Sequence, residues 1–124
     1  MGVIKQKLIA IAGVSYNEEK YGFKIFRDLI KSGYNVQGIN PRNGKVLERK
    51  IYKSLKELEI VPDLVITVVP HQITERIVEE CRELGIKQMW MQPGSESEKA
   101  ILLAQENGLD LVHDACFLVQ SGLE

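Results

Sequence analysis

The stretch Leu8-Ile9-Ala10-Ile11-Ala12-Gly13-Val14-Ser15 decides which fold class we expect for this chain. Its first five residues are all apolar, which is typical of a strand buried on both faces of a parallel sheet. Gly13 ends the run. The segment Lys20–Lys31 then places its large apolar residues on one face of an expected helix, which Gly33 stops. A buried strand, a glycine turn and an amphipathic helix in that order indicate the start of a βαβ unit.

Strand-like and helix-like segments alternate over the rest of the chain. Further strands are expected at residues 35–39, 63–69, 88–92 and 109–112. Further helices are expected at residues 54–58 with Ser54 as N-cap, at 73–84 before Gly85, and from Ser95 or Ser97 to Ala104. Asn40–Gly44 reads as a turn, and the segment from Cys116 onward has no clear pattern.

This alternation predicts a Rossmann-like, doubly wound α/β fold. Five parallel strands would form the middle layer of a three-layer sandwich, joined by right-handed crossovers. A length of 124 residues suits one domain, so we expect residues 1–124 to form a single folded unit.

Composition and charge narrow the function classes. Hydrophobic residues make up 44% of the chain and charged residues 27%, as in ordinary soluble globular proteins. The formal net charge of −1 argues against a nucleic-acid partner, which requires a strongly basic face. The apolar runs are too short to span a bilayer and residues 1–7 lack a signal-peptide core, so we expect a cytoplasmic protein with no membrane partner. Cys81 and Cys116 form no CxxC or Cys/His cluster, which predicts neither a disulfide framework nor a metal site.

The loop after the first strand is the first candidate for ligand binding. In open α/β sheets ligands bind outside the carboxyl ends of the strands. Gly13 allows a phosphate to approach the main chain, free amides at the start of the helix favour an anion, and Ser15 adds a hydroxyl donor. The spacing is not G-x-G-x-x-G, so a tight turn without a ligand is the alternative.

The end of the second strand narrows the choice of ligand. An NAD site requires a carboxylate there for the ribose hydroxyls, but the chain has Ile39-Asn40-Pro41-Arg42, followed by Lys45. Basic groups at this place favour an additional phosphate, such as the 2′-phosphate of NADP or the 3′-phosphate and pyrophosphate of coenzyme A. The alternative is that Arg42 and Lys45 only solvate a loop.

The remaining loops predict no catalytic group. His71 and His113 have no sequence neighbour that marks a nucleophile or a metal site, and neither a G-x-S-x-G nor a Walker motif is present. Pro70 closes the third strand and offers, with Val69, a flat surface for an adenine. Cys81 is expected in the core, whereas Cys116 follows the fifth strand and is expected near the ligand edge.

Taken together, these motifs resemble a known family. The residues that carry the resemblance are Ala12-Gly13-Val14-Ser15, Lys20-Tyr21-Gly22, Gly33-Tyr34-Asn35-Val36 with Asn40-Pro41, Tyr52-Lys53-Ser54-Leu55, Asp63-Leu64-Val65 with Val69-Pro70, Trp90-Met91-Gln92-Pro93-Gly94 and Asp114-Ala115-Cys116. The set resembles the small stand-alone CoA-binding proteins and the N-terminal CoA-binding domain of the succinyl-CoA synthetase α subunit. It covers nearly the whole chain.

The resemblance implies a site for coenzyme A or an acyl-CoA. The pyrophosphate would lie over the first turn, the basic residues after the second strand would meet phosphates, adenine would lie near Val69 and Pro70, and Gln92 and Gly94 would line the pantetheine side. The implied site residues are Gly13, Val14, Ser15, Lys20, Gly22, Asn40, Pro41, Arg42, Lys45, Val69, Pro70, Gln92 and Gly94. The ligase's phosphorylated histidine belongs to a second domain that has no counterpart in this sequence, so we expect binding without catalysis.

Two other functions remain open at this point. The chain is an NADP-binding reductase subunit or fragment if Arg42 meets a 2′-phosphate, or it is a ligand-free interaction module. A homodimer or a complex with a partner enzyme subunit is compatible with each of these functions. We further expect Gly13→Val to abolish binding while the domain stays folded, and Cys116 to form a mixed disulfide with the CoA thiol if the two come within reach.

Overall fold

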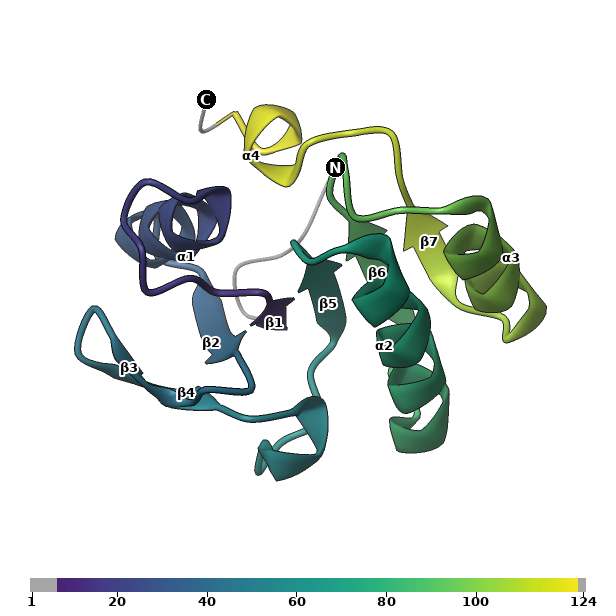
Figure 1. The fold of residues 1–124 in the computed structure, drawn as a ribbon, viewed down its shortest axis with the longest axis horizontal. Helices are drawn as coiled ribbons and strands as arrows, with labels where there is room; N and C mark the ends of the chain where they lie inside the picture. The colour runs from purple at the N-terminus through teal and green to yellow at the C-terminus, as the bar shows by residue number, and fades with distance from the viewer. Residues whose placement is uncertain (1–6, 123–124) are drawn as a thin grey trace.

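The computed structural model describes residues 7–122 and contains one mixed sheet covered by helices on both faces (Figure 1). The strands are β1 (Leu8–Ala12), β2 (Asn35–Ile39), β3 (Gly44–Val46), β4 (Arg49–Tyr52), β5 (Leu64–Thr67), β6 (Gln88–Met91) and β7 (Asp110–Val112). The helices are α1 (Tyr21–Lys31), α2 (His71–Leu84), α3 (Glu98–Glu106), α4 (Phe117–Gln120) and a 3-10 turn, η1 (Leu55–Glu57). The strand order is β3-β4-β2-β1-β5-β6-β7.

The doubly wound arrangement follows from the burial pattern of β1. All five residues of β1 are buried. Ile9 and Ile11 pack in the core on the α1 and α4 side, while Ala10 and Ala12 pack in the core with α2 and α3 on the other face. A strand in the middle of a three-layer sandwich must be apolar on both faces, which explains the uninterrupted apolar run. The Rossmann-like fold class and the five expected strands are confirmed.

The sheet has seven strands in the described residues, because it contains β3 and β4 besides the five expected strands. It is not purely parallel, since β3 and β4 pair in antiparallel fashion. β3 and β4 form an antiparallel hairpin whose two-residue turn is Leu47-Glu48. Both turn residues have positive φ, 51° and 63°, where hairpin turns ordinarily carry Asn or Gly. Without that turn signal and with only three or four residues per strand, the hairpin left no recognisable pattern in the sequence.

The ends of the helices match the sequence in part. Gly85 ends α2 in the left-handed conformation, and the Ser97 side chain caps α3 by accepting a hydrogen bond from the Ala100 amide. Ser54 makes no side-chain cap, so its expected role is wrong; the Glu57 carboxylate instead accepts from the Lys53 amide at 3.2 Å. Among the described helices, none is long and apolar enough to cross a membrane.

The order of the strands locates the ligand edge. β1 lies between β2 and β5, so the chain leaves β1 toward one side of the sheet and continues from β5 toward the other. This is the topological switch point at which doubly wound sheets open a crevice between two loops. The loops that follow β1 and β5 therefore frame the candidate site.

Candidate functional site

The turn after β1 is held tightly against its neighbours. A Cβ on Gly13 would lie 2.2 Å from the carbonyl oxygen of Val68, and the residue has φ +111°. The amides of Gly13 and Val14 both donate to the carbonyl of Ile39, at 3.0 and 3.3 Å. The expectation that Gly13→Val leaves the domain folded is therefore wrong, because no side chain fits at residue 13.

The start of α1 packs directly on this turn. A Cβ on Gly22 would lie 2.1 Å from the carbonyl oxygen of Gly13 and 3.2 Å from the Ser15 nitrogen. The first turn of α1 has no acidic residue. Within residues 7–122, the amides of Ser15 and Tyr16 donate to no acceptor. Unused amides beside a helix start form an environment that favours an anion.

The loop after β2 is tied to the same turn by Asn40. Its side-chain amide donates to the Val14 carbonyl at 2.7 Å, and its side-chain oxygen accepts from the Arg42 amide at 2.8 Å. The Arg42 guanidinium lies 4.9 Å from the centroid of the Tyr16 ring. In the described part of the chain Arg42 forms no ion pair, so its charge is available at the ligand edge.

Tyr16 was not among the expected site residues, yet it connects the two loops. Its ring lies under Arg42, and its hydroxyl is buried without a hydrogen-bond partner among the described residues. Three further expected site residues are exposed. Lys20 directly precedes α1, Pro41 directly precedes Arg42, and Lys45 is on β3. In the sequence, the position of Tyr16 directly after Ser15 was the only sign that it joins the two loops. A single tyrosine is too weak a signal to assign such a role.

A shallow cavity lies between the loops after β5 and β6. Its volume is about 240 Å³, and it is lined by Val68, Val69, Pro70, Pro93, Gly94 and Ser95. The structure thus brings Val69 and Pro70 together with Gly94 at one cavity. The Gly94 amide donates to the Glu96 carboxylate at 2.7 Å.

Buried hydroxyls fix the wall of this cavity. Ser95 Oγ lies 2.9 Å from Thr67 Oγ1 and donates toward the carbonyl oxygens of Gln92 and Thr67 at 2.8 and 3.1 Å. Both hydroxyl residues are buried. These contacts hold the loop after β6 against the end of β5. The sequence indicated Ser95 only as a possible helix cap, and nothing in it marked Thr67 as a partner.

The Gln92 side chain is committed to the C-terminal segment. It is 2% exposed; its oxygen accepts from the Phe117 amide at 2.7 Å, and its nitrogen lies 3.2 Å from the Tyr21 hydroxyl. The same nitrogen lies 3.4 Å from Cys116 Sγ, which is also 2.9 Å from the Tyr21 hydroxyl. Gln92 therefore holds Cys116 and α4 at the ligand edge, with its own side chain turned toward α1.

The thiol pKa values of the two cysteines are shifted in opposite directions. Burial raises the pKa of the Cys81 thiol to about 12, as expected for a core residue. For Cys116, partial burial by itself raises the thiol pKa, but hydrogen bonds from Tyr21, the Val119 amide and Gln92 outweigh it. The net result is a pKa below the ordinary thiol value. A partly exposed thiol with a lowered pKa is the more reactive kind.

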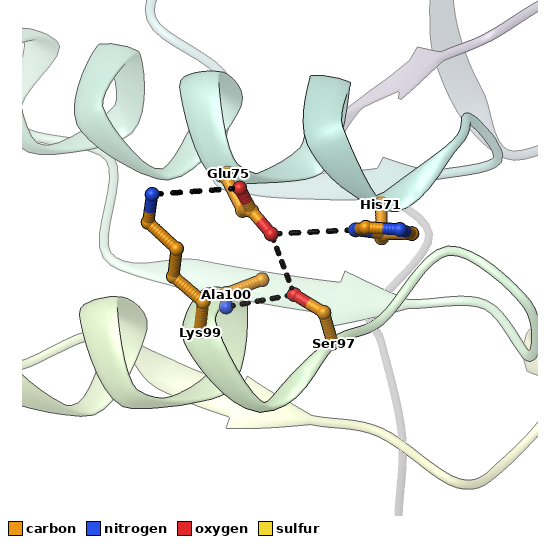
Figure 2. A network of polar contacts seen from close by, with 5 residues as sticks. All are labelled: His71, Glu75, Ser97, Lys99 and Ala100. Carbon is orange, nitrogen blue, oxygen red and sulfur yellow. Dashed lines mark hydrogen bonds and ion pairs between the residues drawn. The ribbon is translucent and has the colours of Figure 1, made fainter.

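Figure 2 shows a polar cluster between the start of α2 and the start of α3. Glu75 accepts a hydrogen bond from Ser97 Oγ at 2.8 Å, and its carboxylate lies 3.4 Å from His71 Nδ1 and 3.9 Å from Lys99 Nζ. The Ser97 hydrogen bond is the main cause that lowers the pKa of the Glu75 carboxyl. Because Ser97 also caps α3, the cluster joins two helix starts. His71, for which the sequence indicated no catalytic or metal-binding neighbour, lies beside Glu75 one helical turn later.

Comparisons with known proteins identify the family of this chain and several of its relatives. A family model described as CoA binding domain matches residues 7–122. The ADP-forming acetate–CoA ligase of Methanocaldococcus jannaschii is 35% identical over 81 residues, covering 65% of this chain and 12% of the ligase. The α subunit of the ADP-forming acetate–CoA ligase II of Pyrococcus furiosus is 30% identical over 119 residues, covering 87% of this chain and 26% of the subunit.

A solved structure extends the similarity to the whole described fold. A conserved hypothetical protein from Pyrococcus furiosus has a TM-score of 0.88 and 33% identity, and the match covers 92% of this chain and 98% of that one. The chain spans no more than about a quarter of the two ligase relatives, but it matches this structure over nearly its full length.

Proposed function

The chain belongs to the CoA binding domain family, and from this premise we propose that it binds coenzyme A or an acyl-CoA at the carboxyl edge of its sheet and holds it without catalysis. The observation that carries the proposal is the juxtaposition of two unused amides, at Ser15 and Tyr16, with the Arg42 cation stacked on the Tyr16 ring. A phosphate placed there gains main-chain donors and a charge-assisted partner in one position.

The phosphate end of the ligand lies over the first turn in this proposal. Gly13, Val14 and Gly22 shape the turn so that Ser15 presents its amide, and Lys20 adds a cation at the start of α1. Asn40 and Pro41 hold the loop that carries Arg42. Lys45, on β3, supplies a further charge for the terminal phosphate.

The remaining parts of the ligand follow the loops after β5 and β6. Adenine packs on Val69 and Pro70; their cavity of about 240 Å³ is smaller than the usual range for whole ligands, as expected where only one flat ring is held. Pantetheine passes along Gly94 and the loop that Gln92 anchors. The thiol end then points toward the segment that contains Cys116.

The relatives suggest the setting in which such binding is useful. Two of them are named as ligases that join acetate to CoA, and this chain matches a minor part of each. In our proposal, the domain is a cytoplasmic carrier or sensor of CoA, acting as a homodimer or with a partner enzyme subunit. It has no role at a nucleic acid or membrane.

Calorimetric titration with CoA, dephospho-CoA and NADPH tests the proposal. We expect CoA to bind, dephospho-CoA to bind more weakly, and CoA at a hundred times its Kd to stabilise the fold by about 2.7 kcal/mol. Binding of NADPH without CoA would support the reductase alternative, and no binding of either would support the ligand-free module.

The absence of catalysis needs its own measurement. Incubation with acetyl-CoA, followed by assay of free thiol, should show release no faster than in protein-free buffer. Thiol release that depends on the protein and disappears after Arg42→Gln would contradict a purely binding role.

A further inference from the structure

A second cavity lies where the β3–β4 hairpin joins the sheet. β2 has five residues, but only Gly38 and Ile39 pair with β4. The residues that precede these pairs border a cavity of about 300 Å³. Its lining comes from α1, β2 and β4 and consists of Phe26, Val36, Gln37, Arg49, Lys50 and Tyr52.

This cavity has cations without anionic partners. In the described part of the chain, neither Arg49 nor Lys50 forms an ion pair. The Lys50 ammonium lies 4.9 Å from the centroid of the Tyr52 ring. Gln37 adds an amide, while Phe26 and Val36 are buried. The cavity therefore has charged and amide donors beside an apolar floor.

The β3–β4 hairpin contains a pair of like charges that lowers its stability. Lys45 and Lys50 are directly opposite each other across the two strands, and like charges in that position destabilise a hairpin. Residues 42–53 carry five basic side chains and one acidic one, although the whole chain has a net charge of −1. Local features that oppose stability are typical of sites selected for binding.

We propose that this cavity is a second anion site that takes a small phosphate-bearing ligand. Arg49, Lys50 and Gln37 all line the cavity, so the first two contribute positive charge and the third contributes an amide donor. The volume of about 300 Å³ accommodates a phosphate or pyrophosphate group.

The topology places Arg49 and Lys50 away from the first turn of the proposed CoA site, although Lys45 of that site is directly opposite Lys50. β4 is parallel to β2, and β2 is parallel to β1, so the carboxyl ends of all three strands share one edge. Arg49 and Lys50 are the first two residues of β4 and lie toward its amino end. The first turn, by contrast, follows the carboxyl end of β1. Neither Arg49 nor Lys50 has a role in the proposed CoA site.

Inorganic pyrophosphate is the probe for the experiment. The amide resonances of the protein are followed by NMR during titration, first without CoA and then with CoA at saturation. We expect shifts at Gln37 and Ile51 in both titrations. The variant with Arg49→Gln and Lys50→Gln should bind at this site about tenfold more weakly or worse, because two charge-assisted contacts are lost. Lys87→Gln, an exposed lysine before β6, is the matched control and should bind as the wild type does.

Two results would overturn the proposal. One is that pyrophosphate shifts only Ser15 and Tyr16 and is displaced by CoA, which would place all phosphate binding at the first turn. The other is that the double variant binds as the wild type does at Gln37 and Ile51. The first titration contains no CoA. It therefore tests pyrophosphate binding at this cavity even if the protein does not bind CoA.

Discussion

The Gly22 main chain packs on the Gly13 carbonyl so closely that a Cβ on Gly22 would lie 2.1 Å from the oxygen. The contact seats the start of α1 on the turn that follows β1. Both glycines are therefore required by the fold at the same place where we propose that a phosphate binds.

Replacing Gly22 with alanine should destabilise the protein and weaken CoA binding together. The added methyl group forces α1 away from the turn, at a cost of about 1–3 kcal/mol in the free energy of unfolding. Denaturant unfolding and calorimetry measure the two effects. Gly33→Ala is the control: no atom lies within 4 Å of its Cβ, so only its positive φ should cost about 1 kcal/mol, with CoA binding unchanged. Equal losses of binding in both variants would contradict the proposed role of the Gly22 contact.

Arg42→Gln should weaken CoA binding about tenfold while the free energy of unfolding stays nearly unchanged, because an exposed charge on a phosphate contributes mainly to binding. The variant should also lose part of the salt dependence of binding. Calorimetry at two ionic strengths measures both quantities. Lys24→Gln, on the exposed face of α1, is the matched control. Equal affinities for Arg42→Gln and the wild type would remove Arg42 from the site.

Cys116 should react with iodoacetamide at lower pH than an ordinary thiol. Its pKa is lowered in the folded protein, so the reactive thiolate is present in a larger fraction near neutral pH. Tyr21→Phe removes one of the stabilising hydrogen bonds and should shift the pH profile of the alkylation rate upward. Cys81, whose pKa is raised to about 12, is the internal control and should stay unlabelled. An unchanged profile in Tyr21→Phe would contradict this origin of the shift.

The disulfide of CoA offers a test of where the thiol end of the ligand lies. The Cys116 thiolate would attack one sulfur of the CoA disulfide, the mixed disulfide would form, and one CoA thiolate would leave. Mass spectrometry should then show a single CoA adduct on Cys116 that is absent in Cys116→Ser. An adduct that forms equally fast on denatured protein would show that binding does not direct the reaction.

The Glu75 cluster should contribute to stability at neutral pH but not in acid. The pKa of Glu75 is lower in the folded protein than in the unfolded chain. Its contribution is therefore present above the unfolded pKa and is lost as the pH falls through the folded pKa. The difference in unfolding free energy between wild type and Glu75→Gln should shrink from pH 7 to pH values below the ordinary glutamate pKa of about 4.3. Glu106→Gln, near the end of α3, is the control and should show little change with pH.

Local sequence patterns were sufficient to predict much of the fold. The five apolar residues before Gly13 indicated a strand covered on both faces, and β1 is buried throughout. The glycines after β1 and α2 marked where each element ends. These features are readable from sequence because they depend on periodicity and on φ angles that few residues adopt. The β3–β4 hairpin was not predicted from the sequence, because its turn places Leu47 and Glu48 at positive φ. Asn and Gly are the residues usually found in that conformation.

For the candidate site too, the sequence predicted some features and not others. Topology alone placed Ser15, Arg42 and Pro70 at one edge, because the carboxyl ends of parallel strands share that edge. The partners of these residues were beyond reach of the sequence. The ring of Tyr16 under Arg42 joins residues of two different loops. The contact of Gln92 with the Phe117 amide spans 25 residues.

The sequence by itself determined the alternation of strands and helices, the glycine turn after Ala12 and the absence of a carboxylate after Ile39, since each depends on residues adjacent in the chain. Only the tertiary structure decided that Gly13 cannot carry a side chain, that the Gln92 side chain lies between α1 and α4, and that Arg49 and Lys50 border a cavity. Each of these depends on which distant segment packs against the residue, and packing of that kind is set by the whole core.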